Sequence, residues 1–289
     1  MSWIPQVVDK LPSTSLTDLA PVDAIPAGRT VELPGRGSTY VTDSGDSDAP
    51  PLILLHALAC TGLLTWYPVL PEMSKNYRVI TLDQRWHGRG IKSDKFHLED
   101  CADDVAALAD VLGLDKFLLA GYSMGGLVAQ LTWRRHPDRV RGLVLCSTAA
   151  NFERGRADGL ALGALRTAAH RIRPKFVDAL TPDRPADTDP RSWAFREFRS
   201  TPSGAITRAG NEIVRFDSRD WVHRVDVPAA VCVTTRDKLI PAGHQRRLTK
   251  AIDGATQQNV DAGHAACVMK SDKFVPAFKS ACASVNARA

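Results

Sequence analysis

The sequence has no long apolar run, no closely paired cysteines and no block of basic residues. None of its apolar stretches approaches the ~18 residues that a transmembrane helix requires, so stable membrane insertion is not expected. The six cysteines are scattered without a Cys-x-x-Cys pair, which argues against a zinc ribbon or a thioredoxin-type redox site. The net charge of +5 includes no run of lysine or arginine, so a nucleic-acid-binding arm is not indicated either.

Motifs for metals and nucleotide cofactors are also missing. The eight histidines are dispersed, no His-Glu-x-x-His sequence occurs, and no Walker-type loop or Gly-x-Gly-x-x-Gly follows an expected strand. Residues 1–9 lack the basic and apolar regions of a signal peptide, and Cys146 and Cys232 lie within apolar stretches typical of buried, reduced thiols. We therefore expect no metal, no cofactor and a cytoplasmic location, and leave the oligomeric state open.

The apolar pattern predicts strands that alternate with helices. Short apolar runs, typical of strands buried on both faces, occur at 52–55, 78–82, 116–120, 142–146 and 229–234. Residues 258–260 suggest a weaker sixth strand. Helical periodicity is present at 97–112, 127–136 and 271–285, the last with Pro276 acceptable only in its first turn, and residues 31–41 suit a hairpin. This order predicts an α/β fold with a mostly parallel central sheet flanked by helices.

The pattern also divides the chain. Residues 1–30 contain four prolines and read as an extended lead-in. The alternation then covers 31–148 and 225–289, which we predict to form the core domain. Between them, residues 149–224 contain proline breaks and no buried strand, which indicates a mostly helical insertion.

One short motif indicates chemistry. Residues 121–125 read Gly-Tyr-Ser-Met-Gly and come between an expected strand and an expected helix. This is the context of a nucleophile elbow, in which a serine in a strained turn, with positive φ, projects its hydroxyl above the sheet. Strand and helix then pass so close that the positions two before and two after the serine must be small, as Gly121 and Gly125 are. The sequence therefore predicts Ser123 as a nucleophile.

From about residue 30 to its end the chain resembles the α/β-hydrolase superfamily, in its serine hydrolase and esterase branch with a helical cap. The resemblance includes the Gly-Tyr-Ser-Met-Gly-Gly sequence at 121–126, the Leu-His-Ala-Leu sequence at 55–58, which is similar to the family's His-Gly oxyanion loop, and the Asp-x-Arg-x-x-Gly turn at 83–88. It implies the α/β-hydrolase fold, with residues 149–224 as the cap. It disfavours the haloalkane dehalogenase branch, which has aspartate where Ser123 stands.

The resemblance also implies the partners of Ser123. Asp237, in an Asp-x-x-x-Pro loop after a strand, matches the family's acid, and His264, in a Gly-His loop near the end of the chain, matches its base. The backbone N–H groups of Leu58 and Met124 would form the oxyanion hole. The sequence departs from the family at Ala57, where a glycine is usual.

The remaining expectations concern the substrate. The candidates for the pocket are His56, Tyr122, Leu63, Trp66, Phe152 and Trp193, although His56, like His87, is also expected to brace its loop. We expect a serine hydrolase that cleaves a small-molecule carboxylic ester or thioester through an acyl-enzyme. The alternatives on the same triad are an acyltransferase, a C–C or amide hydrolase and a cofactor-free peroxidase. A ligand-binding member of the fold without catalysis is the alternative outside the enzymes.

Overall fold

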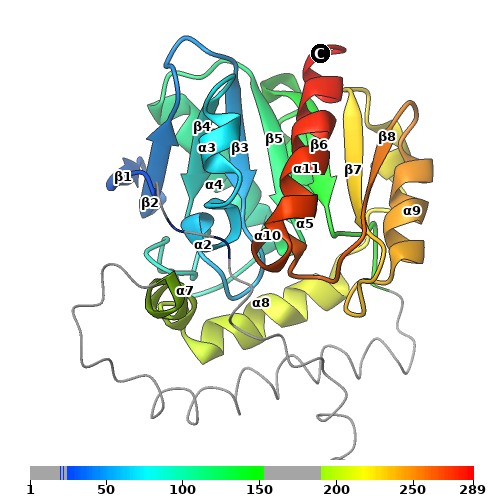
Figure 1. Ribbon diagram of the computed structural model, residues 1–289. Helices are drawn as coiled ribbons and strands as arrows, with labels where there is room; N and C mark the ends of the chain where they lie inside the picture. The colour runs from blue at the N-terminus through cyan, green and yellow to red at the C-terminus, as the bar shows by residue number, and fades with distance from the viewer. Residues whose placement is uncertain (1–19, 21, 23–24, 153–189) are drawn as a thin grey trace, which may run out of the picture.

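A computed structural model of the chain, which describes Ala20, Val22 and residues 25–152 and 190–289, is built around one eight-stranded sheet (Figure 1). In chain order the strands are β1 (Gly28–Leu33), β2 (Gly37–Ser44), β3 (Pro51–Leu55), β4 (Arg78–Leu82), β5 (Phe117–Tyr122), β6 (Val140–Cys146), β7 (Ala229–Thr234) and β8 (Thr256–Val260). The hairpin β1–β2 is antiparallel and β2 joins β4 in the same sense, whereas β3 to β8 are parallel to their neighbours. The α/β fold and the predicted strands are confirmed.

The strand order creates a crevice at one edge of the sheet. Across the sheet the order is β1-β2-β4-β3-β5-β6-β7-β8, so the chain leaves β3 toward β4 on one side and returns to β5 on the other. The connections after β3 and β5 therefore diverge at their carboxyl ends. In open α/β sheets this switch point is where ligands bind.

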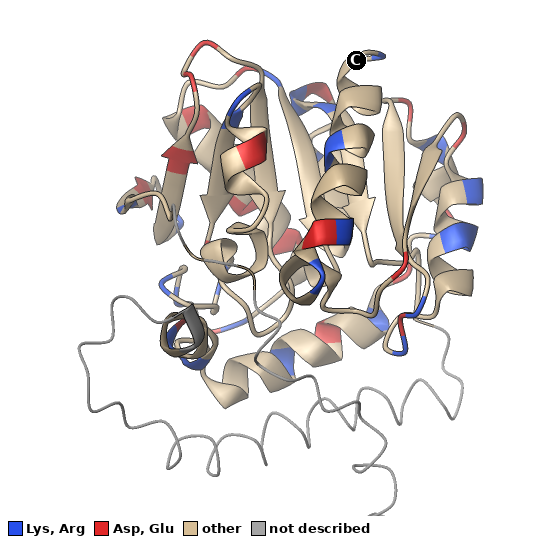
Figure 2. Ribbon diagram, in the orientation of Figure 1, with Lys and Arg blue, Asp and Glu red and all other residues tan. Residues whose placement is uncertain are grey.

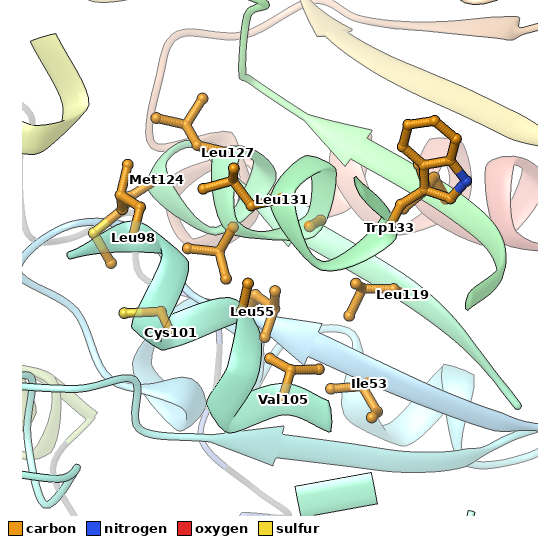
Figure 3. Packing of buried hydrophobic residues seen from close by; sticks show 14 of the residues in the cluster. Ile53, Leu55, Leu98, Cys101, Val105, Leu119, Met124, Leu127, Leu131 and Trp133 are labelled. Carbon is orange, nitrogen blue, oxygen red and sulfur yellow. The ribbon is translucent and has the colours of Figure 1, made fainter. Parts of the chain in front are cut away.

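The apolar runs are continuous because each face of the sheet supports its own core. In β3, Ile53 and Leu55 face α4 (Leu98–Val111) and α5 (Met124–Arg135), as Figure 3 shows. Leu52 and Leu54 face the opposite side and pack with aromatic residues of α11 (Ser271–Asn286). Side chains alternate across a strand, so both faces of β3 must be apolar when helices cover both.

The predicted helices are present, with one correction. The expectation that Pro276 must lie in a first turn is wrong, because α11 begins at Ser271 and continues through it. Proline removes one backbone hydrogen bond there, but the buried stripe of Phe274, Phe278 and Cys282 continues along the helix and outweighs that loss. The structure also contains α9 (Ala242–Ala251). The shorter α2 (Gly62–Trp66), α3 (Leu70–Met73) and α10 (Ala266–Met269), and the 3₁₀ turns Pro137–Arg139 and Val222–Arg224, were not expected from the sequence.

The described part of the predicted cap is helical. It comprises α7 (Pro190–Arg199) and α8 (Ser203–Arg215), which lie beyond the carboxyl edge of the sheet in Figure 1. The buried side of α8 includes Ile206 and Ile213. Residues 153–189 of the cap and 1–19 of the lead-in lie outside the described residues, so the proposed domain boundaries stay a prediction.

Charged side chains lie mainly on helix surfaces and in loops. In Figure 2 the strands in the middle of the sheet are almost entirely free of them, whereas the outer side of α9 is basic. This distribution agrees with the two apolar cores. None of the helices in the described ranges has the length and apolarity needed to cross a membrane.

Candidate active site

Ser123 occupies a strained turn between β5 and α5. Its φ of 53° and ψ of −113° lie outside the regions that L-residues prefer, as the motif predicted. The turn is held by three hydrogen bonds: the Ser123 N–H donates to the carbonyl of Cys146 (2.9 Å), and the Ser123 carbonyl accepts from the Gly126 N–H (2.9 Å) and the Thr148 hydroxyl (2.9 Å). Ser123 as a whole is 8% exposed. The surrounding structure thus stabilises a conformation that would otherwise cost roughly 1–3 kcal/mol.

The glycines of the motif are required by the close approach of strand and helix. A Cβ atom at Gly121 would lie 2.1 Å from the carbonyl oxygen of Gly125, and one at Gly125 would lie 2.2 Å from the carbonyl oxygen of Leu55. Both obstacles are backbone atoms, which cannot rotate away as a side chain does. The elbow therefore admits no larger residue at these positions.

Replacing Gly121 by alanine is expected to lower the free energy of unfolding by about 3 kcal/mol or more, because the strand and helix must separate. The matched control is Gly210→Ala in α8, where a Cβ meets open space and alanine favours the helix by about 1 kcal/mol. Urea unfolding followed by circular dichroism measures both. Equal stability of the two variants would contradict the tight packing of the elbow.

The structure brings His264 and Asp237 into line with Ser123. His264 Nε2 lies 3.0 Å from Ser123 Oγ, and His264 Nδ1 lies 2.8 Å from Asp237 Oδ2. The three residues come from the loops after β5, β8 and β7, all at the carboxyl edge of the sheet. The Asp237 side chain is fully buried, whereas that of His264 is 22% exposed. The partly exposed imidazole therefore lies between the buried acid and the serine hydroxyl.

Hydrogen bonds hold the Asp237 carboxylate in its charged form. Its Oδ1 accepts from the N–H groups of Leu239 and Ile240, each at 2.9 Å. Burial alone raises the pKa of Asp237, but the hydrogen bond and charge of His264, together with the backbone donor of Ile240, bring the pKa below its ordinary value. The carboxylate is thus ionised at neutral pH and accepts the Nδ1 proton of His264, which leaves Nε2 free to accept the proton of Ser123.

Two residues beside Asp237 were missed by the sequence reasoning. The Thr234 hydroxyl donates to Asp237 Oδ2 (2.9 Å), and the buried Gln245 amide donates to the same oxygen (3.2 Å) and to the Ile240 carbonyl (2.7 Å). The sequence feature that could have indicated this role is the position of Gln245, an uncharged amide on the same buried side of α9 as Leu248. These groups fix the orientation of the carboxylate.

Leu58, one of the two predicted oxyanion donors, lies in a tight turn after β3. We call residues 57–60 the oxyanion turn; it is closed by a hydrogen bond from the Cys60 N–H to the Ala57 carbonyl (3.2 Å). The left-handed residue of this turn is Ala59 (φ 64°), not Ala57, where the family's glycine stands. Within the described part of the chain, neither the Leu58 N–H nor the Met124 N–H donates to a protein group.

Four of the six predicted pocket residues are buried in the protein interior, which gives their assignment to the pocket no support. Leu63, Trp66 and Tyr122 belong to the core on the α11 side of the sheet. The Tyr122 hydroxyl donates to the backbone carbonyl of His264 (2.6 Å), so this side chain supports the histidine loop. His56 is fully buried, and its Nε2 accepts from the Gln84 N–H (2.8 Å) while Nδ1 contacts the Ala57 carbonyl (2.8 Å). It braces the oxyanion turn, as the alternative interpretation held.

The other two predicted pocket residues are partly exposed. Trp193, on α7, packs edge-on against Tyr67 at a ring separation of 5.0 Å. Phe152 lines a hollow of about 410 Å³ beside the end of α8, together with Val214 and Phe216. Among the described residues that line this hollow, none belongs to the Ser123, His264 and Asp237 set. The pocket assignment of Phe152 and Trp193 stays a prediction.

Two buried histidines beneath the site make folding sensitive to acid. Burial lowers the pKa of His56 to about 4, and burial together with the nearby His56 lowers the pKa of His87 to about 3. Both groups are neutral in the folded chain but bind a proton below pH ~6.5 once unfolded. Their contribution is present above pH ~6.5 and is lost as the pH falls from there toward 4.

Between pH 6 and pH 5 we therefore expect the free energy of unfolding to fall by about 2 kcal/mol, up to about 1.4 kcal/mol for each histidine. Urea unfolding at a series of pH values measures this slope. His87→Leu is expected to halve it, and the control His223→Gln, at an exposed position, to leave it unchanged. A slope that His87→Leu does not alter would contradict the assignment.

Known proteins are similar to this chain in sequence and in fold. The family described as alpha/beta hydrolase fold matches residues 50–270. The chain is 23% identical over 262 residues to 3-oxoadipate enol-lactonase 1 of Acinetobacter baylyi, covering 87% of this chain and 96% of the relative. It is 27% identical over 244 residues to the putative carbamate hydrolase RutD of Rhizobium rhizogenes, covering 78% and 90%. The crystal structure of the enol-lactonase from Burkholderia xenovorans LB400 superposes with a TM-score of 0.70 at 25% identity, covering 88% of this chain and all of the other.

The described residues include no group of three or more histidine, cysteine, aspartate or glutamate side chains able to hold a metal ion. The side chains that converge at the switch point are a hydroxyl, an imidazole and a carboxylate. Such a set suits nucleophilic attack on an acyl carbon.

Proposed function

The chain belongs to the alpha/beta hydrolase fold family, and from that premise we propose that it hydrolyses a small carboxylic ester or thioester through an acyl-enzyme on Ser123. The observation that carries the proposal is the continuous line of contacts from Ser123 Oγ to His264 Nε2 (3.0 Å) and from His264 Nδ1 to Asp237 Oδ2 (2.8 Å). A serine hydroxyl is a weak nucleophile by itself and needs such a base.

In the proposed reaction, Ser123 Oγ attacks the acyl carbon while its proton passes to His264 Nε2. The tetrahedral intermediate collapses when His264 returns that proton to the departing alcohol or thiol, which leaves the acyl group on Ser123. Water then attacks the acyl carbon while its proton passes to the same imidazole. The second tetrahedral intermediate collapses when His264 returns this proton to Ser123 Oγ, which breaks the bond to the acyl group, releases the acid and restores the enzyme. Asp237 stays ionised throughout and stabilises the imidazolium that forms twice in each cycle.

The negative oxygen of each intermediate would be bound by the N–H groups of Met124 and Leu58. Met124 begins α5, so its N–H is one of the donors that an α-helix leaves without an internal partner. The Leu58 N–H lies in the oxyanion turn braced by His56. Preorganised donors of this kind commonly contribute about 100-fold to 1,000-fold each to kcat.

Two of the relatives suggest cyclic esters among the substrates. The Acinetobacter baylyi and Burkholderia xenovorans proteins are named as enol-lactonases, and a lactone presents the same acyl carbon as a linear ester. For a lactone the leaving hydroxyl stays attached to the acyl-enzyme, so the second step must be fast enough to prevent re-closure. The proposal therefore covers linear esters, thioesters and lactones.

A substrate panel tests the reaction class. We expect steady multiple turnovers on at least one p-nitrophenyl ester, thioester or lactone, with the free acid as the main product. Added methanol would divert the acyl group into a methyl ester if the enzyme were chiefly an acyltransferase. Release of no more than one equivalent of p-nitrophenol per chain across the whole panel would contradict hydrolysis and favour a ligand-binding protein.

A further inference from the structure

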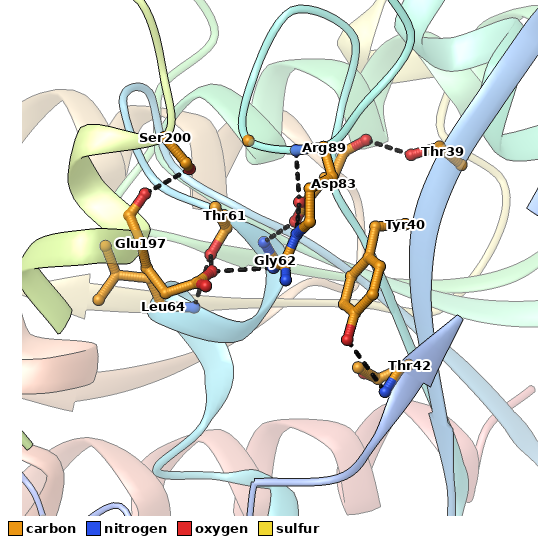
Figure 4. A network of polar contacts seen from close by, with 12 residues as sticks. Thr39, Tyr40, Thr42, Thr61, Gly62, Leu64, Asp83, Arg89, Glu197 and Ser200 are labelled. Carbon is orange, nitrogen blue, oxygen red and sulfur yellow. Dashed lines mark hydrogen bonds and ion pairs between the residues drawn. The ribbon is translucent and has the colours of Figure 1, made fainter. Parts of the chain in front are cut away.

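A carboxylate from the cap reaches the segment that directly follows the oxyanion turn. Glu197 lies on α7. Its Oε2 accepts a hydrogen bond from the Thr61 hydroxyl (2.5 Å) and forms an ion pair with Arg89 (3.0 Å). Figure 4 shows these contacts between two parts of the chain 136 residues apart. The Glu197 side chain is 12% exposed, so the contact is largely withdrawn from water.

Thr61 connects this contact to the oxyanion turn. It follows Cys60, the last residue of the turn, and it is the N-cap of α2, where its Oγ1 accepts from the Leu64 N–H (3.1 Å). A hydroxyl has one proton, which goes to Glu197, while its lone pair takes the Leu64 N–H. Any displacement of Glu197 therefore acts on the residue that directly follows the turn.

The opposite side of the same helix start is held from the sheet. Asp83, after β4, accepts from the Gly62 N–H through Oδ1 (2.9 Å) and from the Arg89 N–H through Oδ2 (2.9 Å). Gly88 packs so closely that a Cβ there would lie 2.5 Å from Asp83 Oδ2 and 2.7 Å from Thr61 Cγ2. The Asp83–Gly88 turn found in the sequence thus packs against the start of α2 and forms a hydrogen bond with it. Arg89 forms ion pairs with both Asp83 and Glu197.

Local helix stability does not account for an acid at position 197. Glu197 lies in the last turn of α7, where the helix dipole disfavours negative charge. Its favourable interactions are those with Thr61 and Arg89 of the core. A second hydrogen bond joins the same two parts of the chain: the Gly88 N–H donates to the hydroxyl of Thr201, just after α7 (3.1 Å).

From this arrangement we propose that Glu197 is a positioning residue, which fixes the oxyanion turn when α7 of the cap is docked. The inference deepens the proposed function and rests on it for its catalytic consequence. Asp83, at the end of a strand, accepts a hydrogen bond from Gly62 at the start of α2. Glu197, on the cap helix α7, accepts one from Thr61 at the same place. The Leu58 N–H, three residues before Thr61, is aligned with the oxyanion only when both carboxylates are in place.

Kinetics of Glu197→Ala and Glu197→Gln test the catalytic consequence. We expect Glu197→Ala to lower kcat by about 10-fold to 100-fold, less than the loss of a whole oxyanion donor, with KM changed less than about threefold. Glu197→Gln keeps an acceptor oxygen and should lose less. The inhibition constant of an alkylboronic acid, whose tetrahedral adduct occupies the oxyanion hole, should rise by the same factor as kcat falls.

The matched control is Glu212→Ala. Glu212 is the acid of the neighbouring cap helix α8, and it pairs with His97 of the core and with Arg215, away from the oxyanion turn. We expect this variant to retain the kcat of the unmodified chain. A fall in kcat of equal size in both variants would overturn a specific role for Glu197, since any loosening of the cap would then suffice.

Hydrogen exchange provides a readout that does not depend on catalysis. Peptides covering residues 57–64 should exchange faster in Glu197→Ala than in the unmodified chain and in Glu212→Ala. Unchanged exchange together with unchanged kcat would overturn the inference, even if the melting temperature falls. Absence of ester turnover in the unmodified chain would instead contradict the proposed function, and faster exchange in Glu197→Ala would still support the positioning of the turn.

Discussion

Ser123→Ala is expected to lower kcat by about a millionfold, because the loss of the nucleophile alone costs nearly as much as the loss of the whole triad. The substitution removes only the Oγ that lies 3.0 Å from His264 Nε2. The backbone bonds from Ser123 to Cys146 and Gly126 are kept. Steady-state hydrolysis of the best ester from the panel, measured with protein free of other esterases, gives the result.

A companion variant separates loss of chemistry from loss of folding. Ser123→Gly removes the same hydroxyl but also relieves the strain of φ 53°, which alanine retains. We expect both variants to be equally inactive and the glycine variant to be about 1 kcal/mol more stable than the alanine variant. Activity in either variant above about one thousandth of the original would mean that another group performs the attack.

Asp237→Asn is expected to lower kcat by about 10⁴-fold, the loss found when a triad aspartate becomes asparagine. The asparagine oxygen is suited to the Leu239 and Ile240 N–H donors, which places its NH₂ group where Asp237 Oδ2 stood. That NH₂ then faces His264 Nδ1 and can only donate to it. The imidazole is forced into the tautomer with its proton on Nε2, which cannot accept the Ser123 proton.

The same substitution also leaves buried donors unmatched. The Thr234 hydroxyl and the Gln245 amide both donate to Asp237 Oδ2, and an NH₂ group at that place accepts neither. The control is Asp261→Asn, three residues before His264, where an exposed aspartate pairs with Arg236 and Lys273. We expect the control to change kcat less than about twofold. A similar loss in both variants would contradict a special role for Asp237.

The features that local sequence could predict are those with a local cause. The central strands were predicted because each is a short apolar run with a core on either face, as in β3. The positive φ of Ser123 was predicted because its neighbours two positions away are glycines that leave no room for a Cβ. His264 and Asp237 were inferred from the resemblance, and the geometry that unites them depends on loops 27 residues apart.

Features that depend on contacts between distant parts of the sequence were not foreseen. Trp66 and Tyr122 are close to the site along the chain, but their large apolar surfaces are buried against Phe274 of α11. Ala59, not Ala57, carries the left-handed conformation, and no glycine marks it in the sequence. Glu197 is one acid among many in its segment, and only the fold brings it to Thr61.

The most direct test of Ser123 as the nucleophile is to identify the residue to which a fluorophosphonate becomes covalently attached. After brief exposure at neutral pH, peptide mass spectrometry should place a single adduct on Ser123, and Ser123→Ala and Asp237→Asn should be labelled far more slowly or not at all. Ser147, also at a positive φ but fully buried, should stay unmodified. An adduct on another residue, or full ester turnover in a chain whose Ser123 cannot react, would contradict the account.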